Sequence, residues 1–191
     1  KSLQVFWADC RLRSTAYVDM TTYFIFGAFE TFLPLYLVSI GIEVYLIGII
    51  FAIQVLSIAL TKPFFGKIAD VKNPVYQIMA GLMLLGLSVF MIPFCSDIMF
   101  LLILSLLSGL GMSLSTVATT KYIADIAKRE EIGASMGALS SIMDVGHSSG
   151  PFVTGIIITA SGYAAGFGMA LILAVITTLY FGIMTIRSTK T

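Results

Sequence analysis

Six long apolar stretches, separated by short connections, constrain this chain more than any other feature. They cover 14–40, 44–65, 74–95, 97–124, 131–160 and 163–186. A helix needs about 20 residues to cross the hydrocarbon of a bilayer, so each stretch is long enough to span it. Charged residues make up 11% of the chain, whereas soluble domains carry about 25%. The sequence therefore predicts an all-α membrane protein with six transmembrane helices in a lipid bilayer.

Threading the chain six times through a membrane places all of its basic residues on one side. They are Lys1, Arg11, Arg13, Lys62, Lys67, Lys72, Lys121, Lys128, Arg129, Arg187 and Lys190. The connections near 41–43, 95–97 and 160–163 contain none. Because basic residues stay on the cytoplasmic side, we expect a multi-pass protein of the cell membrane with both ends in the cytoplasm. Membrane topology explains why the basic residues gather on one side, and we therefore expect no nucleic-acid partner.

We divide the chain into three parts: a cytoplasmic linker or interfacial segment at 1–13, a six-helix transmembrane bundle at 14–187 and a cytoplasmic tail at 188–191. No short charged-then-apolar leader precedes the first span, so we expect no signal peptide and a chain that is part of a longer protein. Cys10 and Cys95 fall near opposite faces, so we expect no disulfide. Nothing in the sequence indicates a metal or cofactor.

Small residues, prolines and caps indicate how the helices pack. The fourth span, with Ser108 to Ser115, and the fifth, with Gly133 to Gly155, are rich in small residues, which allow close helix approach in lipid. Pro34 predicts a kink in the first span, and Asn73-Pro74 predicts the start of the third. Similar Pro-Phe-x-Gly and Pro-Phe-x-x-Gly segments in the second and fifth spans predict two inverted three-helix repeats.

Two motifs resemble those of the major facilitator superfamily. The turn Gly66-Lys67-Ile68-Ala69-Asp70-Val71-Lys72-Asn73 resembles its cytoplasmic loop signature after the second helix of each half. The segment Gly146-His147-Ser148-Ser149-Gly150-Pro151 is similar to the glycine-rich fifth-helix motif best known from drug–proton antiporters. Val71 departs from the loop signature, as is typical of second halves. The resemblance implies the C-terminal half of a twelve-helix transporter, with the other six-helix half as partner, although a first half would look similar.

Intramembrane ionisable groups are expensive and each needs an explanation. Glu30 is either a buried acid satisfied by a neighbouring helix or a proton-coupling residue. Asp144 and His147, three residues apart on one helix face, are either a proton-sharing pair or polar packing groups. Asp19 lies near the cytoplasmic interface, where a solvated acid is the favoured interpretation.

Other residues are candidates for binding or conformational change. Tyr23 shares a helix face with Asp19 and Glu30 and can hydrogen-bond either carboxyl; it is a substrate-cavity candidate. Gln54 is either a substrate contact or an interhelical bond. The resemblance implies that Asp70 faces a helix N-terminus to hold one conformational state, with Gly66 allowing tight passage of the chain. It also implies that Gly146, Gly150 and Pro151 serve helix packing and bending.

The sequence favours a secondary active transporter that works by alternating access, not an enzyme. Ser135 and His147 cannot form a catalytic dyad, because they lie about 18 Å apart along one predicted helix. We expect proton-coupled efflux of a hydrophobic or amphipathic small molecule. Uptake or exchange of a small metabolite is the alternative. A six-helix channel or scaffold is another, although no filter or ring of like charges is visible.

Overall fold

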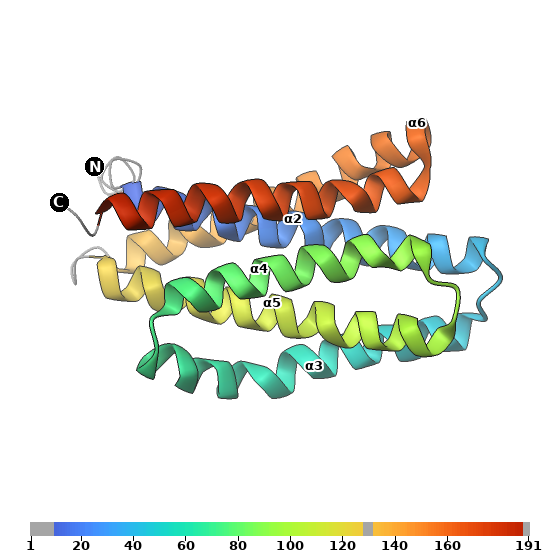
Figure 1. Ribbon diagram of the computed structural model, residues 1–191, viewed down its shortest axis with the longest axis horizontal. Helices are drawn as coiled ribbons and strands as arrows, with labels where there is room; N and C mark the ends of the chain where they lie inside the picture. Colours follow the sequence, from blue (N-terminus) through green and yellow to red (C-terminus); the bar gives the residue numbers. More distant parts are fainter. Residues whose placement is uncertain (1–9, 128–131, 189–191) are drawn as a thin grey trace.

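The computed structural model describes residues 10–127 and 132–188, with side chains to 185, and these residues are helical almost throughout (Figure 1). The elements are α2 (Cys10–Ser39), α3 (Val44–Val71), α4 (Pro74–Met91), the 3-10 helix η1 (Ile92–Phe94), α5 (Ile98–Ile126) and α6 (Ile132–Ser188). Within the described ranges, five helices are long and apolar enough to cross a membrane. The protein is therefore an all-α membrane protein.

The last of these helices, α6, changes direction at Gly162. Its backbone there has φ 84° and ψ 172°, which is non-helical and lies in a region that glycine adopts readily. Figure 1 shows the chain doubling back at this point, so that α6 consists of an N-terminal limb, 132–161, and a C-terminal limb, 163–188. At about 1.5 Å per residue, the limbs are about 45 and 39 Å long. The turn falls where the sequence predicts the connection between the fifth and sixth stretches.

Two helices are longer than the apolar stretches indicate. α2 begins at Cys10, inside the predicted linker segment, and α3 continues to Val71. The prediction that Gly66 to Asp70 form a turn is therefore wrong, because polarity alone does not end a helix. The connection to α4 is confined to Lys72 and Asn73, and Asn73 Oδ1 accepts a hydrogen bond from the Val75 N–H at 3.0 Å. With Pro74 in the first turn, the predicted cap is confirmed.

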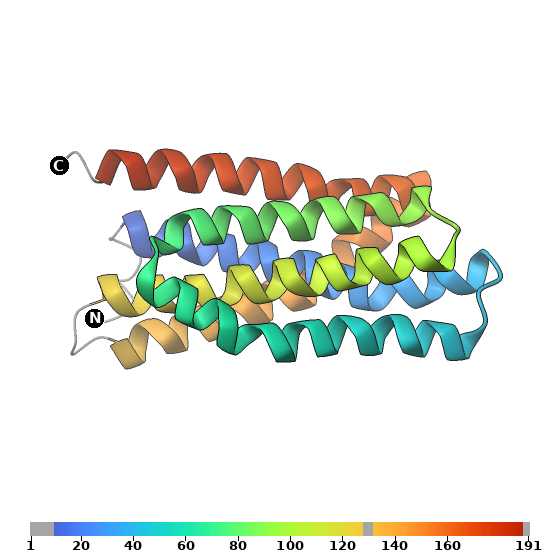
Figure 2. The same cartoon turned by 60° about the horizontal axis from the view of Figure 1, so that its bottom comes forward.

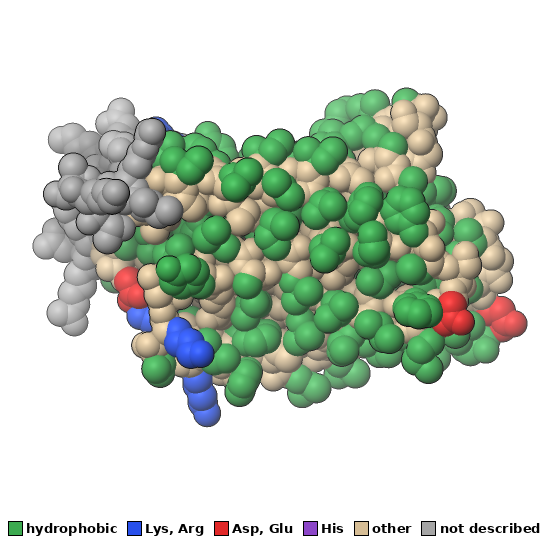
Figure 3. Space-filling model, viewed as in Figure 1, with side chains coloured by type: hydrophobic (Ala, Val, Ile, Leu, Met, Phe, Trp, Pro, Cys, Tyr) green, Lys and Arg blue, Asp and Glu red, His purple; other side chains and the backbone are tan. Residues whose placement is uncertain are grey.

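The start of α2 and the end of α6 lie at the same end of the bundle, and both views agree on this (Figures 1 and 2). On the face drawn in Figure 3, Lys and Arg side chains gather at that end and apolar side chains cover the middle. This distribution agrees with the charge asymmetry of the sequence. The basic residues Lys1, Lys128, Arg129 and Lys190 and most of the predicted terminal segments lie outside the described residues.

Small residues bring the helix backbones into contact. α2 packs mainly against α6, α4 against α5 and α6, and α3 against α5. A methyl group at Gly150 would collide with the Phe24 carbonyl oxygen, and one at Gly146 with that of Met20. Such close approach is the usual way in which helices associate in lipid. Gly146 and Gly150 therefore lie at close helix contacts, and their role in conformational change stays a prediction.

The small residues of the fourth stretch are also buried as predicted. A Cβ at Gly111 would lie 2.6 Å from the Leu85 nitrogen, and Ser108 and Ser115 are fully buried. In the fifth stretch the prediction holds only in part. Gly133 and Gly137 are exposed, and a methyl group added to either would have no described atom within 4 Å. Ser135, Ala138 and Leu139 of the same turns are buried, so Gly133 and Gly137 lie on the outward face of α6.

Asp19 belongs to a row of hydrogen-bonded polar side chains between α2 and α5, which we call the polar seam: Asp19 with Thr119, and Thr22 with Ser115. Its Oδ1 accepts a hydrogen bond from Thr119 Oγ1 at 2.7 Å, and one turn along, Thr22 and Ser115 hydroxyls are 3.1 Å apart. The Asp19 side chain is 2% exposed. The interpretation of Asp19 as a solvated interfacial acid is therefore wrong, because its helix face turns toward α5 and not toward the membrane surface. A buried carboxyl depends on such hydrogen bonds.

We predict that Gly150→Ala destabilises the full-length protein by about 1–3 kcal/mol, because the added methyl overpacks the crossing of α2 and α6. Gly137→Ala is the matched control on the same helix and should be neutral or slightly stabilising, since alanine favours helices. Thermal unfolding in detergent, followed by fluorescence, measures both. Equal effects of the two substitutions would contradict a backbone contact at Gly150.

We also predict that Thr119→Val destabilises the protein by about 1–3 kcal/mol, because it leaves the Asp19 carboxyl buried without its donor. Asp19→Asn should destabilise the protein less than Thr119→Val, because the asparagine amide oxygen can accept the same hydrogen bond without a charge. The double variant Asp19→Leu with Thr119→Val should recover part of the loss. Unfolding midpoints of the four proteins test this, and a double variant less stable than Thr119→Val alone would argue against the seam.

Candidate functional site

Glu30 of α2 and His147 of α6 meet on an exposed face of the bundle, where α2 crosses α6. A hydrogen bond joins His147 Nε2 to Glu30 Oε2 at 3.2 Å, and the two side chains are 46% and 51% exposed. The glycine contact next to them sets this distance: a Cβ at Gly27 would lie 2.5 Å from the His147 carbonyl oxygen. Because the two backbones touch one turn from Glu30, the carboxyl and the imidazole reach each other across the helices.

Each member of this pair lies four residues before a proline in its own helix. Pro34 follows Glu30 in α2, and Pro151 follows His147 in α6. Proline has no N–H, so the carbonyl four residues earlier loses its usual helical donor. The freed His147 carbonyl is the one that faces Gly27, where a Cα–H can make a weak hydrogen bond. Both segments remain helical here, but each helix lacks one backbone hydrogen bond beside the Glu30–His147 pair.

Asp144 is not part of the pair. It is exposed and lines an open depression of about 610 Å³ with Val145, Ser148, Ser149 and Phe152. No hydrogen bond joins Asp144 to His147 in the described part of the chain, so the structure does not bring together the predicted Asp144–His147 pair. Neighbouring positions on a helix can point to different partners, and the imidazole points toward α2, where it also lies 5.9 Å from the Phe26 ring.

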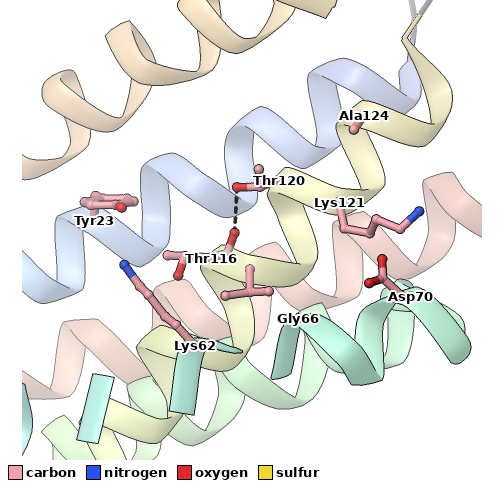
Figure 4. A pocket seen from close by; sticks show the side chains of 9 residues that line it. Tyr23, Lys62, Gly66, Asp70, Thr116, Thr120, Lys121 and Ala124 are labelled. Atoms are coloured by element: carbon pink, nitrogen blue, oxygen red, sulfur yellow. Dashed lines mark hydrogen bonds between the residues drawn. The ribbon is translucent and has the colours of Figure 1, made fainter. Parts of the chain in front are cut away.

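Tyr23 lies on the wall of a cavity of about 380 Å³ between α2, α3 and α5 (Figure 4). The other lining residues are Lys62, Gly66, Asp70, Thr116, Val117, Thr120, Lys121 and Ala124. Lys62 extends toward Tyr23 in Figure 4. The cavity therefore offers hydroxyl, cationic and anionic groups to a ligand.

Asp70 and Gly66 lie at the end of this cavity, and Gly66 differs from what the resemblance implies. Asp70 is near Lys121, which forms an ion pair with Asp125 one turn further along α5. Residues 128–131, just before α6, lie outside the described residues, and the implied contact of Asp70 with a helix N-terminus stays a prediction. Gly66 is helical, and a Cβ there would make ordinary contact with Val117 at 3.8 Å. The expected tight passage at Gly66 is therefore wrong.

Gln54 forms a bond between helices. Its side chain is 1% exposed, and Nε2 donates to Ser108 Oγ at 3.3 Å. The main-chain carbonyl oxygen of Gln54 would lie 2.7 Å from a Cβ at Gly109, so the backbones of α3 and α5 are also in close contact here. Of the two alternatives for Gln54, the interhelical bond is the one present in this structure.

From the sequence, Glu30 and His147 are predicted to belong to separate sites. The signal that could have joined them is the matched pattern of a glycine close before each residue and a proline four residues after it. Chemically, a carboxyl and an imidazole at hydrogen-bond distance can hold and exchange a proton. Within the described ranges, no group of three or more His, Cys, Asp or Glu residues is arranged to hold a metal ion.

Comparison with known proteins yields relatives that are transporters. The uncharacterized MFS-type transporter MJ1560 of Methanocaldococcus jannaschii is 27% identical over 141 residues, 74% of this chain and 36% of that protein. A multi-drug resistance efflux pump PmrA homolog of Lactococcus lactis is 29% identical over 164 residues, which are 82% of this chain and 40% of that protein. The quinolone resistance protein NorA of Staphylococcus aureus is 28% identical over 123 residues, which are 64% of this chain and 32% of that protein.

The chain spans between 32% and 40% of the length of these three relatives. The family model for the major facilitator superfamily matches residues 15–190, which is nearly the whole sequence. This match and the transporter relatives agree with the two motifs at Gly66–Asn73 and Gly146–Pro151. The chain belongs to the major facilitator superfamily.

Proposed function

We propose that this chain is a six-helix half of a twelve-helix secondary active transporter that exports a hydrophobic or amphipathic small molecule in exchange for protons. The Glu30–His147 pair carries the proposal, because proton-binding groups on membrane-spanning helices mark candidate coupling sites. Two relatives are named for resistance or efflux, which supports export. The substrate cavity would be completed by the other half.

In the proposed arrangement, the two limbs of α6 are separate crossings, giving six transmembrane helices in two inverted three-helix repeats. The basic end of the bundle supports placing both termini, with the 1–13 and 188–191 segments, in the cytoplasm. The bundle itself would begin at Cys10 instead of residue 14. The protein would thus be a multi-pass protein of the cell membrane.

The other half would cover α3. In its most apolar stretch 22% of α3 is buried, against 44–50% for α2, α4 and α5. Its exposed apolar side chains are Val44, Tyr45, Ile49, Val55, Leu56, Leu60, Phe64 and Val71. Part of this surface would meet lipid, and part would meet the sequence that the longer relatives have in addition.

In the proposed cycle, Glu30 and His147 accept a proton from one side of the membrane and release it to the other. Gain of a proton changes the attraction between the carboxyl and the imidazole, and this would loosen or tighten the α2–α6 crossing at Gly146 and Gly150. Pro151 would let α6 bend as the halves rock. Asp144 would assist proton exchange from the adjacent depression.

The remaining site residues have supporting roles in the proposal. Tyr23, with its cavity of about 380 Å³, would contact the transported compound. Gln54 would act indirectly, by holding α3 against α5 through its hydrogen bond with Ser108. Asp70 and Gly66 would act at the cytoplasmic end, where Asp70 near Lys121 would stabilise one conformational state.

We predict that Glu30→Gln in the full-length protein abolishes proton release from inverted vesicles triggered by lipophilic cations. His147→Gln should reduce this release at least tenfold, because the carboxyl loses its imidazole partner; a factor of ten corresponds to about 1.4 kcal/mol. Asp144→Asn should have a smaller effect, since Asp144 makes no bond to the pair. A pH-sensitive dye in the vesicle lumen provides the measurement.

Glu43→Gln is the control, because Glu43 is an exposed acid at the start of α3, away from the pair. Cation-triggered proton release that survives Glu30→Gln would refute the coupling role of Glu30, but it would still support export in exchange for protons. A wild-type protein that responds to small metabolites and not to lipophilic cations would support uptake or exchange instead.

A further inference from the structure

An apolar groove of about 380 Å³ runs between α2 and the C-terminal limb of α6, away from Glu30 and from the Tyr23 cavity. Met20, Leu173 and Ile176 form its walls, and Tyr17 and Tyr180 stand at one end. Thr21 and Thr177 also line it, and their hydroxyls are hydrogen-bonded to each other at 2.9 Å. Because these hydroxyls satisfy one another, the groove suits an apolar ligand.

A second hollow, of about 200 Å³, adjoins the first. It shares Tyr17 and Met20 with the groove and is closed on its other side by Ala16, Ile142 and Val145, the last two from the N-terminal limb of α6. Its lining exposes no polar surface. Two apolar hollows therefore flank the same two side chains of α2, one against each limb of α6.

A cation lies one helical turn from the two hollows. Arg13 comes one turn before Tyr17 on α2, its guanidinium contacts Cys10 Sγ at 3.9 Å, and it interacts with the Tyr180 side chain. The Tyr17 and Tyr180 rings meet edge to face, with centroids 5.8 Å apart. A guanidinium has five N–H donors in a rigid fork, so donors remain for a further acceptor.

With α2 spanning the bilayer, this end of the groove would lie at the level of the membrane surface. Arg13 is three residues after the first residue of α2, at the end of the bundle where basic side chains gather. From Arg13 to Met20 the helix rises about 10 Å, the distance over which an acyl chain leaves the headgroup region. Tyrosine is enriched at this level of membrane proteins, and arginine matches the geometry of phosphate.

We propose that this region is a binding site for one anionic phospholipid of the adjacent leaflet. The phosphate group binds Arg13 beside Tyr180, and the two acyl chains occupy the two hollows on either side of Tyr17 and Met20. The positive charge at the entrance selects an anionic headgroup, and the paired hollows select a lipid with two chains. The proposal depends on the membrane location of the helices and not on the proposed transport activity.

Native mass spectrometry of the delipidated full-length protein tests this site. Phosphatidylglycerol, phosphatidylcholine with the same chains, and oleate are each titrated in detergent, and bound molecules are counted. We expect phosphatidylglycerol to bind more tightly than phosphatidylcholine. Arg13→Gln should weaken the tightest phosphatidylglycerol binding about tenfold, as expected for loss of a charge-assisted hydrogen bond. Arg11→Gln, on the same helix, is the matched control and should change it little.

Filling each hollow provides a second, independent measurement. Ile176→Trp should weaken phosphatidylglycerol binding by occupying the groove, and Ile142→Trp should do the same in the second hollow. Ile172→Trp is the control, because Ile172 is exposed on the same limb but does not line the groove. Melting temperatures of all variants verify folding.

Three results would overturn the proposal. The first is equal loss of phosphatidylglycerol binding in Arg11→Gln and Arg13→Gln, which would mean that general charge is responsible. The second is equal binding of phosphatidylglycerol and phosphatidylcholine by the wild-type protein. The third is oleate binding as tight as that of phosphatidylglycerol and equally sensitive to Arg13→Gln, which would assign the site to a single-chain amphiphile.

Discussion

The close crossing of α2 and α6 is the contact on which the rest of the structure depends. Gly27, Gly146 and Gly150 allow the two backbones to touch, and in lipid such contacts replace the hydrophobic force that drives helices together in water. The crossing fixes how far each helix is rotated. That rotation directs Glu30 toward His147 and Asp19 toward α5, and it leaves the two hollows beside Tyr17 facing outward.

The same crossing brings the pair next to two prolines. Pro34 and Pro151 each remove a backbone hydrogen bond at the level of Glu30 and His147. In the proposed cycle, a change in protonation of the pair would act where both helices lack one of their backbone hydrogen bonds. The polar seams of α5 with α2 and α3, in contrast, are held by hydrogen bonds between side chains.

Much of the fold could be predicted from the sequence because lipid imposes simple rules. Apolar length located the helices, Asn73-Pro74 located the start of α4, and small residues located the tight contacts at Gly146 and Gly150. Side-chain partners could not be predicted, because they depend on helix rotation. Asp144 and His147 are neighbours in sequence, yet the imidazole turns to Glu30. Asp19 is near a helix end, yet it faces a neighbouring helix.

A double-variant cycle tests the proposed shared proton site of Glu30 and His147 most directly. Cation-triggered proton release is measured in inverted vesicles bearing the full-length wild type, Glu30→Asp, His147→Gln and the double variant. Glu30→Asp keeps the carboxyl but shortens the side chain by one methylene, so residual activity can be measured. If the two side chains act as one unit, the double variant will lose no more activity than the more affected single variant, as expected for strongly coupled residues. Losses that simply multiply, as for independent sites, would contradict the shared proton site.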